Sequence, residues 1–150
     1  METIAPVSEN EEDAATPPAP VSATELRNAM GHFLTGVTIV TARGIDQPYG
    51  LTVNSFNSVS LDPPLVMFCP GKTSGSWLRM KDAGNFCVNV MAQDQMDLCG
   101  VFASKADDKF AGIDWTTAVT GAPVLPGSLA VIDCETHAIL DGGDHDVVVG

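Results

Sequence analysis

Apolar and polar positions alternate with the period of a β-strand between Gly50 and Pro64, in the stretch GLTVNSFNSVSLDPP. Successive side chains of an extended chain point to opposite faces, so one face of this stretch is mostly apolar and the other carries hydroxyl and amide groups. Asn57 and Ser58 interrupt the alternation, as a β-bulge or a change of sheet would, and Pro63 and Pro64 end it because proline lacks a backbone N–H. The period alone predicts a half-buried strand of an antiparallel barrel.

The same stretch is chemically unusual for a strand. It carries six hydroxyl or amide side chains and no lysine, arginine or histidine. Uncharged donors and acceptors suit a polar, planar ligand that is held by hydrogen bonds better than they suit acid-base catalysis. We therefore treat residues 50–64 as the segment around which a binding site is organised.

Further strands and three helices are predicted from the same kind of pattern. The run from Leu65 to Cys69 is continuously apolar, as in a strand that is buried on both faces. The first helix opens with a capping box at Ser22 and Glu25 and is ended by Gly36. The other expected strands are 37–42, 65–69, 86–91, 128–140 and 144–149, and the expected helices are 22–36, 93–103 and one from Ser74 or Ser76 to Gly84. Residues 112–127 should form an irregular connection with Trp115 packed inward.

Length and charge limit the classes of partner. The 150 residues, 45% of them hydrophobic and 17% charged, predict one globular domain. The formal net charge of -12 argues against nucleic acid or an anionic membrane as a partner, because both would repel the chain. No apolar run approaches the roughly 20 residues of a membrane helix, and the amino terminus lacks the features of a signal peptide. We therefore expect a cytoplasmic protein.

The amino terminus differs in composition from the rest of the chain. Residues 1–22 contain acidic residues and prolines but no basic residue. Such a segment buries too little apolar surface to offset the entropy of ordering it. We expect a disordered acidic tail at residues 1–22 and a folded domain at residues 23–150.

The cysteines do not predict a metal site. None of the four forms a close Cys-x-x-Cys pair, so neither a structural zinc site nor a dithiol redox motif is indicated. Each lies in an apolar context, which is typical of a buried thiol.

The loop from Pro70 to Trp77 favours an anion. Its Gly71-Lys72-Thr73 sequence resembles the end of a P-loop, but that motif needs a glycine where this chain has Val66, so the motif is rejected. The free amides and hydroxyls at the start of the following helix, together with Lys72, could still surround a phosphate. The alternative is a capped helix with an exposed lysine.

Charged and histidine residues elsewhere are weak signals by themselves. Residues 104–110 carry two lysines and Phe110 in what should be a solvated, exposed loop. His32 lies off the apolar stripe of its helix, and His137 alternates with apolar neighbours as a structural residue would. His145 follows a glycine turn at residues 141–143, which places it at the rim of a hairpin.

Four motifs together resemble the flavin reductase family, which has the FMN-binding split-barrel fold. They are Gly36–Thr41, Gly50–Pro64, Phe86–Val90 and the Gly-Asp-His sequence at 143–145. The closest likeness is to the small reductase components of two-component flavin-dependent monooxygenases, and it covers residues 26–150. The resemblance implies a mainly β, six-stranded antiparallel Greek-key split β-barrel with peripheral helices. Family members continue through further strands after the position of Gly150, so the resemblance also implies that the carboxy-terminal end is missing.

The resemblance implies an NAD(P)H-dependent flavin reductase that supplies reduced FMN or FAD to a separate monooxygenase. Hydride passes from NADH or NADPH to the flavin, no catalytic side chain or metal ion is required, and members of the family pair as homodimers. In the family, the loop equivalent to 72–74 lies by the flavin phosphate, the segment equivalent to 105–110 lies near both cofactors, and the histidine equivalent to His145 contacts the nicotinamide dinucleotide. The implied cofactor-binding residues are Gly36, Val37, Thr38, Thr52, Val53, Asn54, Ser55, Ser58, Val59, Ser60, Lys72, Thr73, Ser74, Phe110 and His145, with Lys105 and Lys109 as further contacts.

Two other functions are compatible with the same residues. One is a non-catalytic flavin- or haem-binding split-barrel protein that stores or senses its ligand. The other is a flavoenzyme similar to pyridoxamine-phosphate oxidase, which would use bound flavin directly on an organic substrate. Consumption of NADH on addition of free flavin separates the reductase from the store or sensor, and a neighbouring gene that encodes an oxygenase would favour the reductase.

Overall fold

The computed structural model describes residues 19–150, so most of the expected acidic tail lies outside the described residues. The chain divides into two compact units, residues 1–34 and residues 35–150. The described part of the first unit contains one helix, α1 (Ala23–Met30). Its predicted capping box is confirmed, because the Ser22 hydroxyl accepts from Glu25 N and the Glu25 carboxylate accepts from Ser22 N. The helix ends before Gly36, since Gly31 already closes it with a bond to the Arg27 carbonyl.

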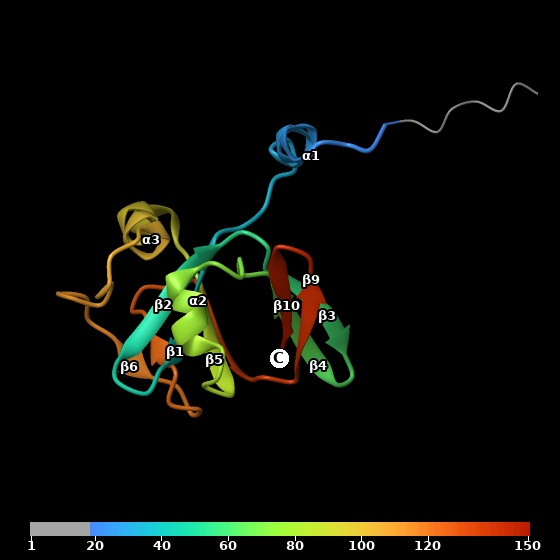
Figure 1. Cartoon of the computed structure of the whole chain (residues 1–150). Helices are drawn as coiled ribbons and strands as arrows, with labels where there is room; N and C mark the ends of the chain where they lie inside the picture. The colour runs from blue at the N-terminus through green and yellow to red at the C-terminus, as the bar shows by residue number, and fades with distance from the viewer. Residues whose placement is uncertain (1–18) are drawn as a thin grey trace, which may run out of the picture. The chain divides into compact units, whose positions relative to one another are not determined.

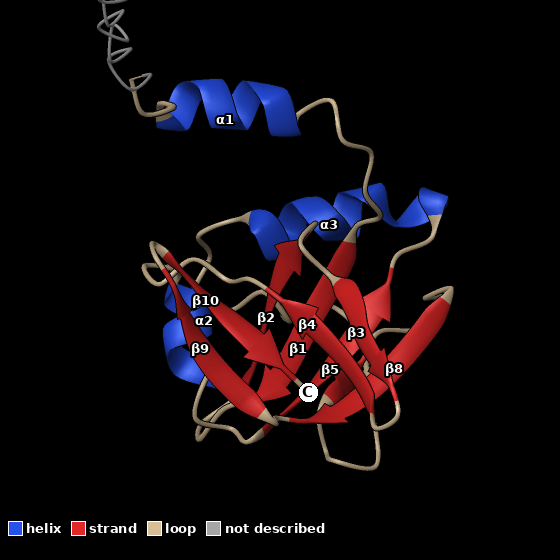
Figure 2. Cartoon of the chain, turned by 90° about the vertical axis from the view of Figure 1, so that its right-hand side faces the viewer, coloured by secondary structure: helices blue, strands red, loops and turns tan. Residues whose placement is uncertain are grey.

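The second unit is mainly β, with antiparallel sheets and short helices, as predicted (Figure 1). Its first sheet has the order β2 (Pro48–Val53), β1 (Thr38–Arg43), β5 (Asn85–Val90) and β8 (Ala130–Glu135). Its second sheet has the order β3 (Asn57–Leu61), β4 (Pro64–Phe68), β10 (His145–Val149) and β9 (Ala138–Gly142). A small third sheet pairs β6 (Thr116–Thr117) with β7 (Pro123–Val124). Figure 2 shows the second sheet from its own side.

The eight longer strands of residues 19–150 are divided between the two four-stranded sheets. The segment 128–140, which was expected to be one long strand, contributes to both sheets. It breaks at Thr136 and His137, where the backbone N–H of His137 donates to the Val149 carbonyl over 2.8 Å. The chain leaves the first sheet at this point and enters the second.

The central stretch divides differently from the prediction. The strand β2 ends at Val53, residues 54–56 form the connection, and β3 begins at Asn57. The expected interruption at Asn57 and Ser58 lies inside β3, although its pairing with β4 does contain an irregularity between Ser58 and Ser60. The following strand is also less buried than expected, because only Phe68 of β4 is fully enclosed. One face of the second sheet remains accessible.

The main core lies between the two four-stranded sheets. Phe68 of the second sheet packs edge-on against Phe86 of the first, with ring centroids 5.0 Å apart. Phe68 also meets Trp77 at 5.9 Å. Trp77 belongs to α2 (Gly75–Met80), which begins at the predicted cap Ser74 and packs against β2. This packing fixes α2 beside the end of β2.

A second core cluster holds the remaining helix in place. The segment predicted as one helix consists of a short 3-10 turn, Gln93–Gln95, followed by α3 (Met96–Ala103). Phe102 of α3 is fully buried and meets Phe110, which in turn meets Trp115. Trp115 is therefore packed inward as predicted. None of the helices in residues 19–150 is long and apolar enough to cross a membrane.

Candidate functional site

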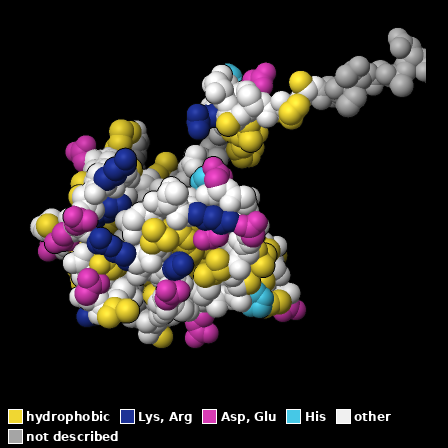
Figure 3. Space-filling view, viewed as in Figure 1, with side chains coloured by type: hydrophobic (Ala, Val, Ile, Leu, Met, Phe, Trp, Pro, Cys, Tyr) yellow, Lys and Arg dark blue, Asp and Glu magenta, His cyan; other side chains and the backbone are white. Residues whose placement is uncertain are grey.

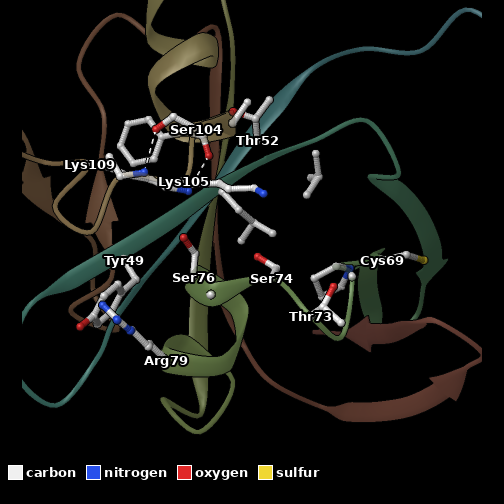
Figure 4. A pocket seen from close by; sticks show the side chains of 18 of the residues that line it. Tyr49, Thr52, Cys69, Thr73, Ser74, Ser76, Arg79, Ser104, Lys105 and Lys109 are labelled. Carbon is white, nitrogen blue, oxygen red and sulfur yellow. Dashed lines mark hydrogen bonds between the residues drawn. The ribbon is translucent and has the colours of Figure 1, made fainter.

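A pocket of about 880 Å³ opens between β2, α2 and the segment that follows α3. That volume lies in the range of small-molecule and cofactor sites. The wall is lined by some of the residues in each of three segments, 49–55, 69–79 and 102–109, and by His145. Figure 4 shows Ser74 and Ser76 on one side, pointing toward the loop that carries Ser104 and Lys105 on the other.

Gly50 allows the two sides of the pocket to approach. A Cβ atom at this position would lie 2.7 Å from the ring of Phe102 and 3.2 Å from Thr41 Cγ2. Both distances are shorter than normal carbon contacts, so a larger residue would push α3 away from β2. The glycine at the start of the central stretch therefore sets the distance between β2 and the loop after α3.

The structure brings nine of the residues predicted as contacts to this pocket. Polar groups from distant parts of the chain converge there, as expected from the sequence. The predicted residues in the pocket wall are Thr52, Val53, Asn54, Ser55, Thr73, Ser74, Lys105, Lys109 and His145.

Two of the predicted hydroxyl groups in the pocket wall donate to backbone carbonyl oxygens. Thr52 Oγ1 donates to the Cys99 carbonyl over 2.7 Å and so joins β2 to α3. Ser55 Oγ donates to the Cys69 carbonyl and accepts from the Cys69 N–H over 2.9 Å. These side chains position the pocket wall. Asn54 is exposed and makes no hydrogen bond among the described residues, so it is free to bind a ligand.

Other predicted contacts lie outside the pocket. Gly36 and Val37 precede β1, and the hydroxyl of buried Thr38 donates to the Val53 carbonyl over 3.4 Å. Ser58, Val59 and Ser60 belong to β3 in the second sheet. Neither group of residues forms part of the wall. Their assignment as cofactor contacts remains a prediction from the family resemblance.

Lys72 also lies outside the pocket wall, although its neighbour Thr73 is part of it. Its ammonium group forms ion pairs with Asp141 and, at 3.9 Å, with Asp146. The hydrogen bond to Asp141 raises the pKa of Lys72 and lowers that of the carboxyl group. The lysine joins its loop to the β9–β10 hairpin.

The last two residues of the segment 104–110 are less exposed than the sequence indicated, whereas residues 104–108 are exposed as expected. Phe110 is only 7% exposed and belongs to the second core cluster, outside the pocket wall. Lys109 is only 9% exposed. Its ammonium group donates to the carbonyl oxygens of Phe102, at 2.8 Å, and Gly50, at 3.3 Å. Burial lowers its pKa.

Sequence reasoning missed several residues of the wall, above all Tyr49 and Arg79, and it named Ser76 only as a hydroxyl at the start of the helix. The Arg79 guanidinium carbon lies 5.5 Å from the centroid of the Tyr49 ring, and Arg79 is 3.6 Å from a carboxylate oxygen of Asp107. Ser76 precedes Arg79 by three residues, so the two lie on one side of α2. That spacing was the available signal for finding them once α2 had been placed beside β2.

His145 lies at the edge of the pocket, as its rim position predicted. Its Nδ1 atom is 2.7 Å from a carboxylate oxygen of Asp144, and this contact lowers the pKa of Asp144. The backbone around it pairs with Gly71 and with Pro70, whose carbonyl accepts from the Asp146 N–H over 3.0 Å. The histidine and the loop at 70–76 are therefore held together.

The donor set of the pocket fits a flavin or a nicotinamide dinucleotide. Asn54, Thr73 and Ser76 offer uncharged polar groups, Leu51, Val53 and Ala103 line the pocket with apolar side chains, and Lys109 offers a buried cation. Such a mixture matches a flat, polar ring system with an anionic substituent. Figure 3 shows basic side chains scattered among acidic ones on the face seen in Figure 1, so the surface there is not uniformly acidic despite the net charge of -12.

Residues 30–150 match the flavin reductase like domain family. The relative HsaB from Rhodococcus jostii, the reductase subunit of a flavin-dependent monooxygenase, is 47% identical over 144 residues. That match covers 96% of this chain and 74% of the relative.

Solved structures agree with this match. The nitrilotriacetate monooxygenase component B from Mycobacterium thermoresistibile has a TM-score of 0.81 at 48% identity, with 85% of this chain and 71% of that chain covered. The NADH:FAD oxidoreductase SgcE6 from Streptomyces globisporus, in complex with NAD and FAD fragments, has a TM-score of 0.79 at 40% identity. The SgcE6 match covers 85% of this chain and 77% of the SgcE6 chain. The chain described here is thus a member of the flavin reductase like domain family.

Proposed function

We propose that this protein is an NAD(P)H:flavin oxidoreductase that supplies reduced FMN or FAD to a partner flavin-dependent monooxygenase. The observation that carries the proposal is the pocket, whose groups from β2, α2 and the loop after α3 suit binding and orientation. The relatives named above are reductase components or flavin oxidoreductases, which supports the same activity and the same kind of partner.

The flavin and the nicotinamide supply the hydride chemistry when both are bound. The protein's part would be to hold the two in contact and in the right orientation. Asn54, Thr73 and Ser76 are the free hydrogen-bonding groups that would hold the flavin, and His145 at the rim would hold the nicotinamide dinucleotide. Thr52 and Ser55 act indirectly, because they fix the wall from which these groups project.

The proposal extends to the assembly. Six of the strands in the two four-stranded sheets would form the family's Greek-key split barrel, and two copies would pair as a cytoplasmic homodimer. The pairing is supported by apolar side chains on both edge strands of the second sheet, where Leu61 is 92% exposed and Leu140 is 55% exposed. Exposed apolar surface of this kind favours association. Light scattering should give twice the chain mass, and an active monomer would contradict the pairing.

Anaerobic mixing of the protein with NADH and free FMN or FAD tests the activity. We expect the absorbance of NADH and the visible absorbance of the flavin to fall together, one NADH for each flavin, with no organic substrate added. Tight flavin binding without consumption of NADH would instead indicate a store or sensor. A requirement for an organic substrate would indicate a flavoenzyme of the pyridoxamine-phosphate oxidase type.

A further inference from the structure

Lys109 is a buried cation without an anionic partner. It is 9% exposed, and none of the ion pairs among residues 19–150 includes it. Two backbone carbonyls accept from its ammonium group, which has three N–H donors, so one donor is left. Burying a charge is unfavourable unless an opposite charge compensates it. The folded protein therefore keeps an uncompensated positive charge, which is energetically unfavourable, at the wall of the pocket.

The other basic residues of the pocket do not share this situation. Arg79 is close to the carboxylate of Asp107, and Lys105 is exposed, so water solvates its charge. A ligand that brings a negative charge into the pocket therefore gains most from Lys109. The interaction there is also the least screened by solvent.

The position of Lys109 indicates which part of a flavin it would meet. The opposite side of the pocket, from Thr73 to Ser76, is rich in hydroxyl groups and partly open, which suits a hydrated phosphate. The side with Lys109 carries Leu51 and Ala103, whose apolar side chains suit the ring system. Figure 4 shows Lys109 on the side of Ser104 and Lys105, across from Ser74 and Ser76.

We propose that Lys109 is the electrostatic partner of the reduced flavin ring and binds the reduced form more strongly than the oxidised form. This inference rests on the proposed flavin reductase function. Hydride transfer moves one proton and two electrons from the nicotinamide ring, which becomes a cation, to the flavin ring, which gains one negative charge. The ammonium group faces that charge only after the transfer, so it favours the reaction and not merely binding.

The test measures the dissociation constants of oxidised and of dithionite-reduced FMN under anaerobic conditions. Lys109→Met and Lys109→Gln should weaken the binding of reduced FMN roughly tenfold more than that of oxidised FMN. That ratio corresponds to a fall of about 30 mV in the two-electron potential of the bound flavin. Lys109→Arg keeps the charge and should restore most of the ratio.

Lys81→Met is the matched control, because it removes one exposed lysine that lies outside the pocket, and the ratio should stay at its wild-type value. Equal losses for both oxidation states in the Lys109 variants would overturn the proposal. They would assign Lys109 to the phosphate or to support of the wall. Wild-type protein that neither binds FMN nor oxidises NADH would instead refute the proposed function.

The wild type gives a second readout that needs no variant. A nearby cation should hold the bound reduced FMN in its anionic form at lower pH than free reduced FMN. Absorbance spectra of the bound reduced flavin over a pH series measure this directly. A protonation midpoint equal to or above that of free reduced FMN would contradict the role given to Lys109.

Discussion

Two lysines, one in the pocket wall and one just outside it, differ in ways that the sequence does not show. Lys72 follows a glycine in a polar loop and is joined to Asp141 and Asp146 across the β9–β10 hairpin. Lys109 follows two aspartates in a charged segment, yet it is buried and meets only backbone carbonyls. The lysine that looked ready for an anion already has two carboxylates, and the one that looked solvated has none. The cation available to a ligand is therefore decided by tertiary partners.

The same distinction separates Ser55 from Asn54. Ser55→Ala removes both hydrogen bonds to the Cys69 backbone, so the N–H of Cys69 loses its acceptor, Ser55 Oγ. We expect a loss of about 1–3 kcal/mol in the free energy of unfolding, measured by urea denaturation. Asn54→Ala should leave the unfolding free energy nearly unchanged and weaken flavin binding. If Asn54→Ala were the destabilising variant, the division between structural and free donors would be wrong.

His145 tests the side of the pocket that carries Lys72. His145→Ala should raise the Michaelis constant for NADH roughly two- to tenfold, because one hydrogen bond to the dinucleotide is lost. Flavin affinity should change little, and turnover at saturating NADH should be largely kept. Steady-state kinetics and a flavin titration measure both quantities. Weakened flavin binding with a level NADH constant would move His145 into the flavin site.

The two lysines should also respond to pH in opposite directions. Burial lowers the pKa of Lys109 in the folded state. At pH values between this lowered pKa and the ordinary lysine pKa, the unfolded state therefore binds more protons than the folded state. The contribution of Lys109 to stability therefore rises with pH in that window. The pKa of Lys72 is raised by Asp141, so its contribution is present below the ordinary value and is lost as pH rises through the folded value.

Urea midpoints from neutral pH to above the ordinary lysine pKa of about 10.5 test this, as differences between the wild type and each methionine variant. As pH rises, the urea midpoint of the wild type should increase relative to that of Lys109→Met. The urea midpoint of the wild type should decrease relative to that of Lys72→Met. This change should be small, because the ion pair of Lys72 with Asp141 is exposed. If the midpoint differences of the two variants changed with pH in the same direction, the two lysines would not respond to pH in opposite ways.

The smallest expected effect is that of Lys72 on flavin binding. Lys72→Met removes a charge that two carboxylates already compensate outside the pocket wall. Flavin affinity should therefore stay within about twofold of the wild type. A tenfold loss would show that Lys72 leaves its carboxylates to bind the ligand.

Local patterns predicted the elements well but not their partners. The start of α2 at Ser74, the capping box at Ser22 and the hairpin turn before His145 each depend on a few adjacent residues. The break at Thr136 and the burial of Lys109 depend on contacts with Gly84, Val149, Gly50 and Phe102, which no local pattern contains. Placement of the sheets and of free charges therefore required the structure.

The candidate site shows the same limit. Resemblance to the family identified Asn54, Thr73 and His145, all of which reach the pocket. It gave no indication that the hydroxyl groups of Thr52 and Ser55 bind backbone carbonyls. A donor-rich sequence reports how many donors exist, and only tertiary packing reports how many remain free.

The most direct test of the account is a flavin titration of variants that fill the pocket. Ser76→Trp places a large side chain between α2 and the loop after α3, whereas Leu78→Trp places the same side chain on α2 at a 51% exposed position outside this wall. The account predicts that Ser76→Trp abolishes saturable binding of FMN and FAD while Leu78→Trp binds as the wild type does. Equal flavin affinity in two folded variants would contradict the assignment of this pocket as the flavin site.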